Sequence, residues 1–277
     1  MSAEDATNQE NIQVVNSVVA SEDVPPFNLI EERPGGDEPE NLTGTAGDDL
    51  IDGFGGDDTI TGLEGDDILI GGDGDDEIDG GRGTNRLYGD AGDDTITSSG
   101  SYDFVDAGEG KNNIILTRNA VAGTYQSGSK DDIYNLEDGY ISSGNGNYLR
   151  LEAGAGSDTI HVNTSLSGGD IYLLDGHDTI NINKASTTNW HYIYGGSGND
   201  NFNVIEGSRH AFAYSGEDGN DIFNLTGNSS FSTTFELYGN NGNDIFNLTG
   251  DASFNGRVYL EGYDDDDTFN ITGDFYS

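Results

Sequence analysis

The sequence predicts an all-β protein in which a parallel β-roll of short repeats continues into a wider, right-handed parallel β-solenoid with coils of about 20–23 residues. Three observations predict this fold. Residues 44–115 repeat every nine residues without a slip. Residues 116–277 keep the same acidic and apolar marks at longer intervals. The composition, with 43 glycines in 277 residues and a hydrophobic fraction of 32%, is too polar for an ordinary globular core.

Residues 44–115 form eight units of nine residues. In order they read GTAGDDLID, GFGGDDTIT, GLEGDDILI, GGDGDDEID, GGRGTNRLY, GDAGDDTIT, SSGSYDFVD and AGEGKNNII. Glycine at positions one and four predicts a tight turn, because glycine accepts backbone angles that other residues resist. The last three residues predict a short strand with one inward apolar side chain. Such a strand cannot bury itself, so the units must stack. Two units close one coil, and residue i lies over residue i+18.

Position six of each unit is Asp or Asn, and stacking places these residues in two columns. One column holds Asp49, Asp67, Asn85 and Asp103, and the other holds Asp58, Asp76, Asp94 and Asn112. Adjacent coils lie about 4.8 Å apart, a spacing at which bare carboxylates repel one another. A hard divalent cation removes that repulsion, and calcium suits irregular, carbonyl-rich turns better than magnesium does. The columns therefore predict several bound Ca²⁺ ions.

The repeat resembles the RTX, or haemolysin-type, calcium-binding repeat, whose unit is G-G-x-G-x-D-x-U-x with U a large apolar residue. The resemblance covers residues 44–115 at nearly every defining position. It implies that each ion lies between the turns of adjacent coils, bound by position-six Asp side chains and turn carbonyl groups. The implied metal-binding side chains are Asp49, Asp58, Asp67, Asp76, Asp94, Asp103, Asp158, Asp178, Asp200, Asp221, Asp244 and Asp267. The implied carbonyl ligands lie near Gly44, Gly53, Gly62, Gly71, Gly195, Gly216 and Gly239.

These turns are not expected to bind calcium equally well. The stacked pairs with two carboxylates are Asp49/Asp67, Asp58/Asp76 and Asp76/Asp94. A turn with Asn85 or Asn112 keeps an oxygen but loses a charge, so we expect weaker binding there or none. The acids at position five are expected to point outward and to add negative field rather than ligands. They are Asp48, Asp57, Asp66, Asp75 and Asp93.

Beyond residue 116 the unit lengthens, but an acid followed two places later by an apolar or aromatic residue persists. The acids are Asp132, Asp158, Asp178, Asp200, Asp221, Asp244 and Asp267, at intervals of 26, 20, 22, 21, 23 and 23 residues. An alternating stretch before each turn predicts a second strand, so each coil has one glycine–Asp turn and one variable turn. The glycine–Asp turns then form a single calcium row. Three turns depart from the pattern: Lys130 stands at position four, the Asp178 turn lacks its first glycine, and Asp265 replaces a glycine.

An asparagine follows the inner residue in five of these coils. The asparagines are Asn181, Asn203, Asn224, Asn247 and Asn270. Stacked at one coil position, they predict an amide ladder. The alternative is an outward polar row that binds sugar or ice. Ice binding is disfavoured because the threonine column of calcium-dependent ice-binding solenoids is missing. Its place is taken by Ser197, Asp218, Asn241 and Asp264.

The N-terminal residues lack the repeat. Residues 1–40 are acidic, which predicts a linker or cap that is partly disordered. Within them, residues 12–19 (IQVVNSVV) suit a short strand or a short helix that covers the end of the solenoid. The predicted division of the chain is thus 1–40 as linker or cap, 41–115 as nonapeptide β-roll, and 116–277 as a degenerate β-solenoid.

The net charge, the cysteine content and the N-terminal sequence limit the binding partners and the cellular location that can be expected for the chain. The chain has 52 acidic and 10 basic residues, a formal net charge of −42, which disfavours nucleic acid and anionic membranes as partners. It has no Cys. No apolar run is long enough to span a bilayer, and the N-terminus lacks the pattern of a cleaved signal peptide. The RTX resemblance implies type I secretion, which predicts a secreted bacterial protein, extracellular or at the cell surface.

Catalysis is not expected. The sequence contains neither H-E-x-x-H nor G-x-S-x-G, so the protease and lipase modules found beside RTX repeats are missing. His191 and Tyr192, one coil before Arg209 and His210, are the single hint of an epimerase-like site. We therefore expect a non-enzymatic protein that folds on binding Ca²⁺ outside the cell and serves as a surface adhesin or matrix module. The alternative is a calcium-dependent carbohydrate-binding or epimerase-associated module. The expected partners are calcium ions, together with cell-surface polysaccharide or further copies of the chain.

Overall fold

The computed structural model is a parallel β-solenoid, which confirms the predicted all-β class. It describes residues 32–34, 36–117, 123–137, 140–142, 149–183, 191–204, 212–226, 230–231, 235–250, 252–254, 257–273 and 275–276. These residues contain strands and turns but no helix. Accordingly, no helix in this part of the chain is long and apolar enough to cross a membrane.

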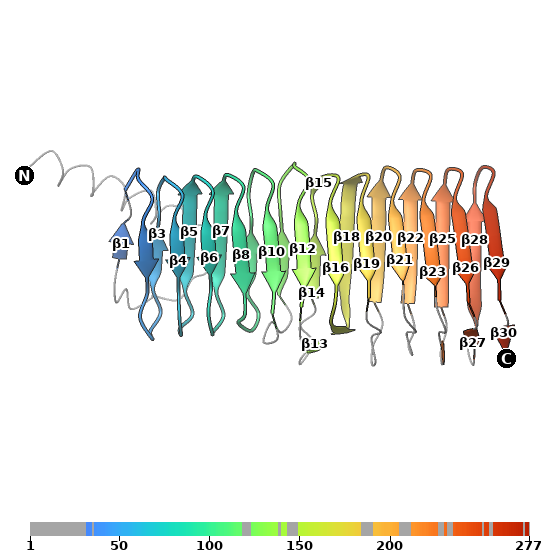
Figure 1. Ribbon diagram of the computed structural model, residues 1–277, viewed down its shortest axis with the longest axis horizontal. Helices are drawn as coiled ribbons and strands as arrows, with labels where there is room; N and C mark the ends of the chain where they lie inside the picture. Colours follow the sequence, from blue (N-terminus) through green and yellow to red (C-terminus); the bar gives the residue numbers. More distant parts are fainter. Residues whose placement is uncertain are drawn as a thin grey trace, which may run out of the picture.

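Two long sheets of parallel strands form opposite walls of the rod. The first sheet contains β1 (Glu32–Pro34), β3 (Leu50–Asp52), β5 (Ile68–Asp73), β7 (Arg86–Ala91), β9 (Phe104–Asp106), β11 (Thr124–Gln126), β14 (Leu149–Glu152), β18 (Gly169–Gly176), β20 (His191–Ser197), β22 (Phe212–Asp218), β25 (Phe235–Asn241) and β28 (Val258–Tyr263), with β15 (Ala155–Gly156) beside β18. The second sheet contains β2 (Asn41–Thr43), β4 (Thr59–Thr61), β6 (Glu77–Asp79), β8 (Thr95–Ser98), β10 (Asn113–Leu116), β12 (Ile133–Leu136), β16 (Thr159–Val162), β19 (Thr179–Ile182), β21 (Asn201–Val204), β23 (Ile222–Thr226), β26 (Ile245–Thr249) and β29 (Thr268–Thr272). Each coil contributes one strand to each of these two sheets, so the strands of each sheet follow one another along the rod in chain order (Figure 1).

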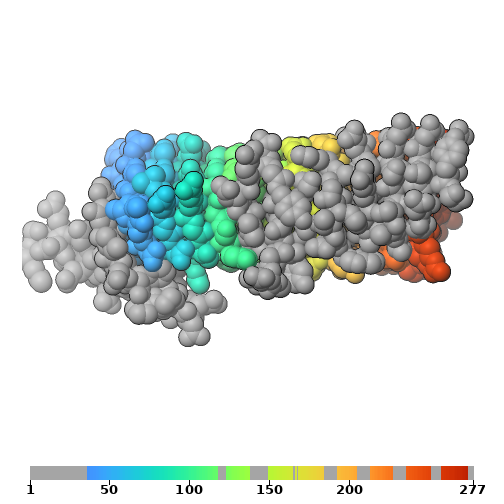
Figure 2. Space-filling view, turned by 90° about the horizontal axis from the view of Figure 1, so that it is seen from below, coloured from blue at the N-terminus to red at the C-terminus, as the bar shows by residue number. Residues whose placement is uncertain are grey.

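Two small sheets lie on the side of the variable turns. They pair β13 (Tyr140–Ser142) with β17 (Ser165–Ser167), and β24 (Ser230–Phe231), β27 (Ala252–Phe254) and β30 (Phe275–Tyr276) with one another. In the space-filling view, the colours pass from one end of the rod to the other in sequence order (Figure 2). The arrangement is that of a repeat protein, in which each coil contacts its neighbours.

The strand register confirms the eighteen-residue coil and its later widening. Ile51 pairs with Leu69, which pairs with Leu87, so each partner lies eighteen residues further along the chain. The spacing then becomes 20 residues between Asn112 and Asp132, and 20 to 26 residues in the coils that follow. The second half therefore continues the same two sheets with longer coils.

The main core is one continuous cluster of inward side chains from both sheets, and on the second sheet its composition changes along the rod. Aliphatic residues such as Ile60, Ile78 and Ile96 fill the early coils and are fully buried. Aromatic residues fill the later ones, where Phe202, Phe223, Phe246 and Phe269 stack with ring centroids 4.7, 4.9 and 4.7 Å apart. The wider coils need this larger side-chain volume to keep the interior filled.

The predicted amide ladder is also present on the outer face of the second sheet. The Nδ2 group of Asn203 donates to Oδ1 of Asn181 at 3.0 Å, and Asn224 donates to Asn203 at 2.9 Å. The ladder continues through Asn247 and Asn270 at 2.8 Å each. These side chains thus bond mainly to one another.

The turns use glycine in two different ways, and one of them differs from the prediction. At position four, Gly56 and Gly65 have φ of 100° and 134°, which favours glycine as expected. At position one, glycine does not have positive φ. Position two does instead, even with a side chain, as at Phe54 (65°) and Leu63 (79°). The position-one glycine is required for space, as the next section shows.

Candidate metal centres

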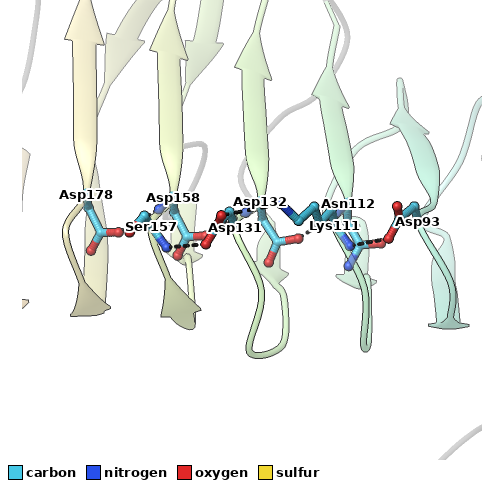
Figure 3. Close-up of polar contacts among 8 residues, drawn as sticks. All are labelled: Asp93, Lys111, Asn112, Asp131, Asp132, Ser157, Asp158 and Asp178. Carbon is cyan, nitrogen blue, oxygen red and sulfur yellow. Dashed lines mark hydrogen bonds and ion pairs between the residues drawn. The ribbon is translucent and has the colours of Figure 1, made fainter.

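The position-six carboxylates form a hydrogen-bonded row along the rod. Oδ1 of Asp76 accepts the backbone N–H of Asp58 at 2.8 Å, and Oδ1 of Asp94 accepts that of Asp76 at 2.9 Å. Each residue stands just before a strand, so the strand register places successive carboxylates in line. We call the turns before first-sheet strands the first edge and those before second-sheet strands the second edge. The second-edge row continues through Asn112, Asp132, Asp158, Asp178, Asp200, Asp221, Asp244 and Asp267, and Figure 3 shows its central part.

The second oxygen of most of these carboxylates is buried and has no hydrogen-bond partner. The residues are Asp58, Asp67, Asp76, Asp94, Asp132, Asp158, Asp178, Asp200, Asp221 and Asp244, each through Oδ2. An unpaired buried carboxylate is strongly unfavourable unless a cation or a proton joins it. The row therefore has a repeated deficit of positive charge.

At most of these turns a second oxygen atom faces the unpaired Oδ2 across the position-one glycine. A Cβ atom on Gly62 would lie 2.5 Å from Oδ2 of Asp67 and 2.7 Å from the carbonyl oxygen of Gly80, one coil further on. We call this arrangement a glycine cradle. It recurs at Gly53, Gly71, Gly89, Gly195, Gly216 and Gly239. The cradle gathers hard oxygen atoms from two coils, which is the ligand type that calcium prefers.

Side chains alone do not complete such a site. Among the described residues, no group of three or more His, Asp or Glu side chains converges on one point. An ion in a glycine cradle would therefore be bound by one carboxylate from its own turn and by backbone carbonyl groups. The fit of a calcium ion depends on the turn backbone as much as on the aspartates.

The electrostatics of the row favour a positive charge beside its carboxylates. Burial raises the pKa of Asp67, Asp76, Asp200 and Asp244 to about 6, against an ordinary value near 3.8. The same cause raises the pKa to about 7 at Asp94, Asp178 and Asp221, and to about 8 at Asp158. These carboxyl groups therefore take up protons at pH values of about 6 to 8 rather than near 3.8, and a divalent cation would compete with those protons.

Three predicted ligands are not among the residues with a buried, unpaired Oδ2, namely Asp49, Asp103 and Asp267. Oδ2 of Asp49 faces Gly44 and the Gly62 carbonyl, but it also accepts the backbone N–H of Thr45 at 2.6 Å. Oδ2 of Asp103 is fully occupied by protein donors, which is analysed below. Asp267 stands immediately before β29, the last strand of the second sheet among the described residues.

The asparagines at position six turn their nitrogen toward the cradle. Oδ1 of Asn85 accepts the N–H of Asp67 at 3.0 Å, so its Nδ2 faces the position-one glycine, Gly80. That Nδ2 is buried and has no acceptor. Oδ1 of Asn112 likewise accepts the N–H of Asp94, and its Nδ2 donates to the Gly108 carbonyl at 3.4 Å. The expectation that these residues keep an oxygen for the ion does not fit this geometry.

Three central turns have an unpaired Oδ2 but no position-one glycine. Position one is Ser127 before Asp132, Ala153 before Asp158 and Leu173 before Asp178. Asp132 was not among the predicted ligands, although its D-x-Y pattern was visible in the sequence and its Oδ2 is as unpartnered as the others. These turns keep the charge deficit without the open glycine cradle.

On each edge the position-five residues form a further, exposed ladder, in which the backbone N–H of the later coil donates to the side chain of the earlier one. The N–H of Asp66 donates to Oδ1 of Asp48 at 2.9 Å, and the N–H of Lys111 donates to Oδ1 of Asp93 at 2.8 Å. Asp131, in the same ladder, forms an ion pair with Lys111 at 3.4 Å (Figure 3). Their exposed position agrees with the outward direction expected from the sequence.

The structure describes only part of the residue group that suggested an epimerase-like catalytic site. Tyr192 lies on β20 in the first sheet and is exposed. Arg209 and His210, which completed the suggested group, lie outside the described residues, as do residues 12–19 of the suggested cap.

A comparison with protein families finds the RTX calcium-binding nonapeptide repeat. The family model, which describes four copies of the repeat, matches residues 34–69, 52–87, 61–96, 79–114, 192–204 and 236–253. A search of curated proteins finds no significant match to the chain. The matched segments include every glycine cradle of the first half and two of those in the second half.

Proposed function

The chain carries RTX calcium-binding repeats in a parallel β-solenoid, and we propose that it is a secreted protein that folds as it binds calcium outside the cell. In this proposal the folded rod serves as a structural module of a cell surface or extracellular matrix. The observation that carries the proposal is the row of buried, unpaired Oδ2 atoms facing carbonyl oxygens in glycine cradles.

The thermodynamic argument begins with the calcium-free state. The formal net charge of −42 opposes compaction, and each unpaired carboxylate in the row adds a desolvation cost. A ligand that binds the folded state alone stabilises it by about 2.7 kcal/mol per site when its free concentration is a hundred times Kd. Several such sites, each linking adjacent coils, make calcium binding and folding one process.

The proposed location follows from the affinity range of such sites. Extracellular calcium modules bind with Kd of about 10⁻⁴–10⁻³ M, well above the free calcium concentration inside cells. A chain with sites of this kind stays unfolded before export and folds afterwards. An unfolded chain suits passage through a narrow type I secretion channel, the route that RTX repeats suggest.

The structural role is supported by the outer faces of the rod. In the C-terminal half, the outer face of the second sheet is occupied by asparagine side chains bonded along the rod axis. A rigid rod whose outer polar side chains already bond to one another is suited to hold other components at a fixed distance or to assemble into a lattice. We therefore place a structural role ahead of carbohydrate binding.

Far-UV circular dichroism during a calcium titration tests the central proposal. We expect a disordered spectrum in chelator that becomes β-rich as calcium approaches millimolar concentration, and no such change with magnesium. A β-rich spectrum in chelator would reject folding on calcium binding.

The structural role needs a separate test with the calcium-loaded chain. Analytical ultracentrifugation over a range of protein concentrations should show calcium-dependent assembly into larger species. A chain that stays monomeric and is instead retained on a polysaccharide column only in calcium would favour the carbohydrate-binding alternative.

A further inference from the structure

The turn before Asp103 differs from every glycine cradle. Its sequence is S-S-G-S-Y-D, with Ser98 rather than glycine at position one. The Ser98 hydroxyl donates to Oδ2 of Asp103 at 2.6 Å, and the backbone N–H of Gly100 donates to the same oxygen at 3.2 Å. Oδ1 of Asp103 accepts the N–H of Asn85 at 2.8 Å, as the row requires. Both oxygens of this carboxylate are therefore satisfied by protein donors.

A buried tyrosine completes this arrangement. The hydroxyl oxygen of Tyr125 lies 3.3 Å from Oγ of Ser98, and the Tyr125 side chain is only 1% exposed. Ser98 has a single hydroxyl proton, which it donates to Asp103, so the phenol of Tyr125 must be the donor to Ser98. Tyr125 belongs to β11, one coil beyond β9 and Asp103. A chain of hydroxyl groups thus links two coils at the place where a cradle would link them through an ion.

A cation would be disfavoured at this turn. In a glycine cradle, Oδ2 faces open space and a carbonyl oxygen, whereas here Oδ2 faces an O–H and an N–H. Both donors would direct positive charge at an ion and would lose their acceptor on its arrival. The backbone N–H of Gly100 cannot be removed by rotating a side chain. Protein donors therefore satisfy both oxygens of the Asp103 carboxylate, and neither oxygen is left to bind a cation together with a carbonyl group.

We propose that Ser98 and Tyr125 replace the calcium ion at the Asp103 turn, which makes this turn metal-free and ends the ion row of the first edge. The inference rests on the proposed function, because it concerns which turns of a calcium-binding solenoid hold ions. Asn85, in the preceding turn of the same edge, already presents a nitrogen to its cradle. Calcium on the first edge is then confined to the turns before Asn85, of which only the Asp67 turn is a glycine cradle with an unpaired Oδ2. The second edge carries most of the ions.

The inference is tested by calcium stoichiometry in two matched single substitutions of the full chain. Asp103→Asn keeps an oxygen to accept the Asn85 N–H and presents its NH₂ to Ser98, but it leaves the Gly100 N–H without its acceptor. Its stability is therefore expected to fall, and the inference is judged on the number of bound ions. Asp76→Asn makes the same chemical change in a glycine cradle. Equilibrium dialysis at saturating calcium should show one ion fewer in Asp76→Asn and an unchanged number of ions in Asp103→Asn.

Each result decides a different claim. If the wild-type chain binds calcium and Asp103→Asn binds one ion fewer, this inference is overturned and the proposed function remains intact. A wild-type chain that binds no calcium overturns the proposed function, and this inference with it.

A second pair of variants tests the hydroxyl link itself. Ser98→Ala removes the donor to Asp103, while Ser99→Ala removes a neighbouring hydroxyl that donates to the Gly81 carbonyl at 2.9 Å. In saturating calcium we expect Ser98→Ala to lower the thermal midpoint clearly more than Ser99→Ala does, with the number of bound ions unchanged. Equal midpoints, or a changed number of ions in Ser98→Ala, would overturn the assignment.

Discussion

The position-one glycines act by leaving room for oxygen atoms. Gly62 does not have a positive φ, yet a Cβ there would lie 2.5 Å from Oδ2 of Asp67 and 2.7 Å from the carbonyl oxygen of Gly80. Any side chain would push these oxygens apart and occupy the space between the two coils. The glycine is therefore part of the proposed metal site although it supplies no side-chain ligand.

Gly62→Ala tests this role. We expect it to weaken calcium binding at the Asp67 turn by at least roughly tenfold, or about 1.4 kcal/mol, because the methyl group displaces two oxygen atoms. Gly55→Ala is the matched control, since the nearest atoms to a Cβ there, from Asp73 and Asp37, lie 3.5 to 4.0 Å away and the φ is ordinary. Isothermal titration calorimetry of both variants compares the sites. Equal calcium binding by the two variants would contradict the role of the cradle.

At the residue scale the sequence predicts where the aspartates lie but not which of their oxygens are free. The nine-residue period places Asp76 and Asp103 in equivalent positions. The difference between them depends on one substitution, Ser98 for glycine, and on Tyr125 from the next coil. The nitrogen of Asn85 is similarly directed by a hydrogen bond from another coil. Such orientations depend on contacts between coils, which the repeat alone does not specify.

At the scale of strands and coils, the stacked phenylalanines replace aliphatic packing in the wider coils. Phe223 is fully buried between Phe202 and Phe246, with ring centroids 4.7 and 4.9 Å away. Phe269, at the end of the stack, contacts Phe246 on one side and is 44% exposed. The two residues occupy the same strand position and differ in burial.

This difference in burial predicts that replacing the two phenylalanines by alanine will lower the free energy of unfolding by different amounts. Phe223→Ala should destabilise the calcium-loaded protein by about 3–5 kcal/mol, because it leaves a cavity in the core. Phe269→Ala should cost much less, because its ring is partly exposed before the change. Urea unfolding at saturating calcium, followed by circular dichroism, measures both. Similar losses in the two variants would show that the stack does not behave as a continuous core.

The sequence predicted the strands and coils well, because the period and the alternation of apolar residues determine them. The pairing of Asn112 with Asp132 across the change of coil length followed from simple counting. The small sheets formed by β13 with β17 and by β24, β27 and β30 did not. They arise on the variable turns, whose lengths and compositions change from coil to coil, so no period indicates them.

The carboxylate row predicts opposite pH dependences with and without calcium. In chelator, the raised pKa values of about 6 to 8 mean that the fold takes up protons which the unfolded chain, near 3.9, does not hold. This contribution to stability is complete below about pH 3.9 and is lost as the pH rises through 6 to 8. In saturating calcium the carboxylates bind as anions, so stability should instead fall on acidification.

Thermal unfolding between pH 5 and pH 8 measures this change of sign. The thermal midpoint, or the β-content if no transition is seen, should fall with rising pH in chelator and rise or stay level in calcium. The same slope in both conditions would show that the row does not exchange protons for calcium.

At the scale of the whole molecule, two properties oppose each other. The formal net charge of −42 is distributed along the chain and favours expansion. The described fold is a rod in which the 12 strands of the second sheet stack at about 4.8 Å, roughly 53 Å from first to last. The described residues include few ion pairs to offset the charge, all with side chains at least partly exposed. We therefore expect bound calcium to supply most of the positive charge along the turns.

Small-angle X-ray scattering should therefore show a large change in size with calcium. An unfolded chain of 277 residues has a radius of gyration of about 58 Å, and self-repulsion increases it, whereas a compact chain of this length is near 19 Å. We expect the larger value in chelator and a value close to the smaller one in calcium, with a distance distribution skewed as for a rod. Raising sodium chloride in chelator is the control, because it screens charge without filling the cradles. It should shrink the chain only partly and without gain of β-structure. A salt-induced rod equal to the calcium form would mean that general charge screening, rather than ions bound in the turns, completes the fold.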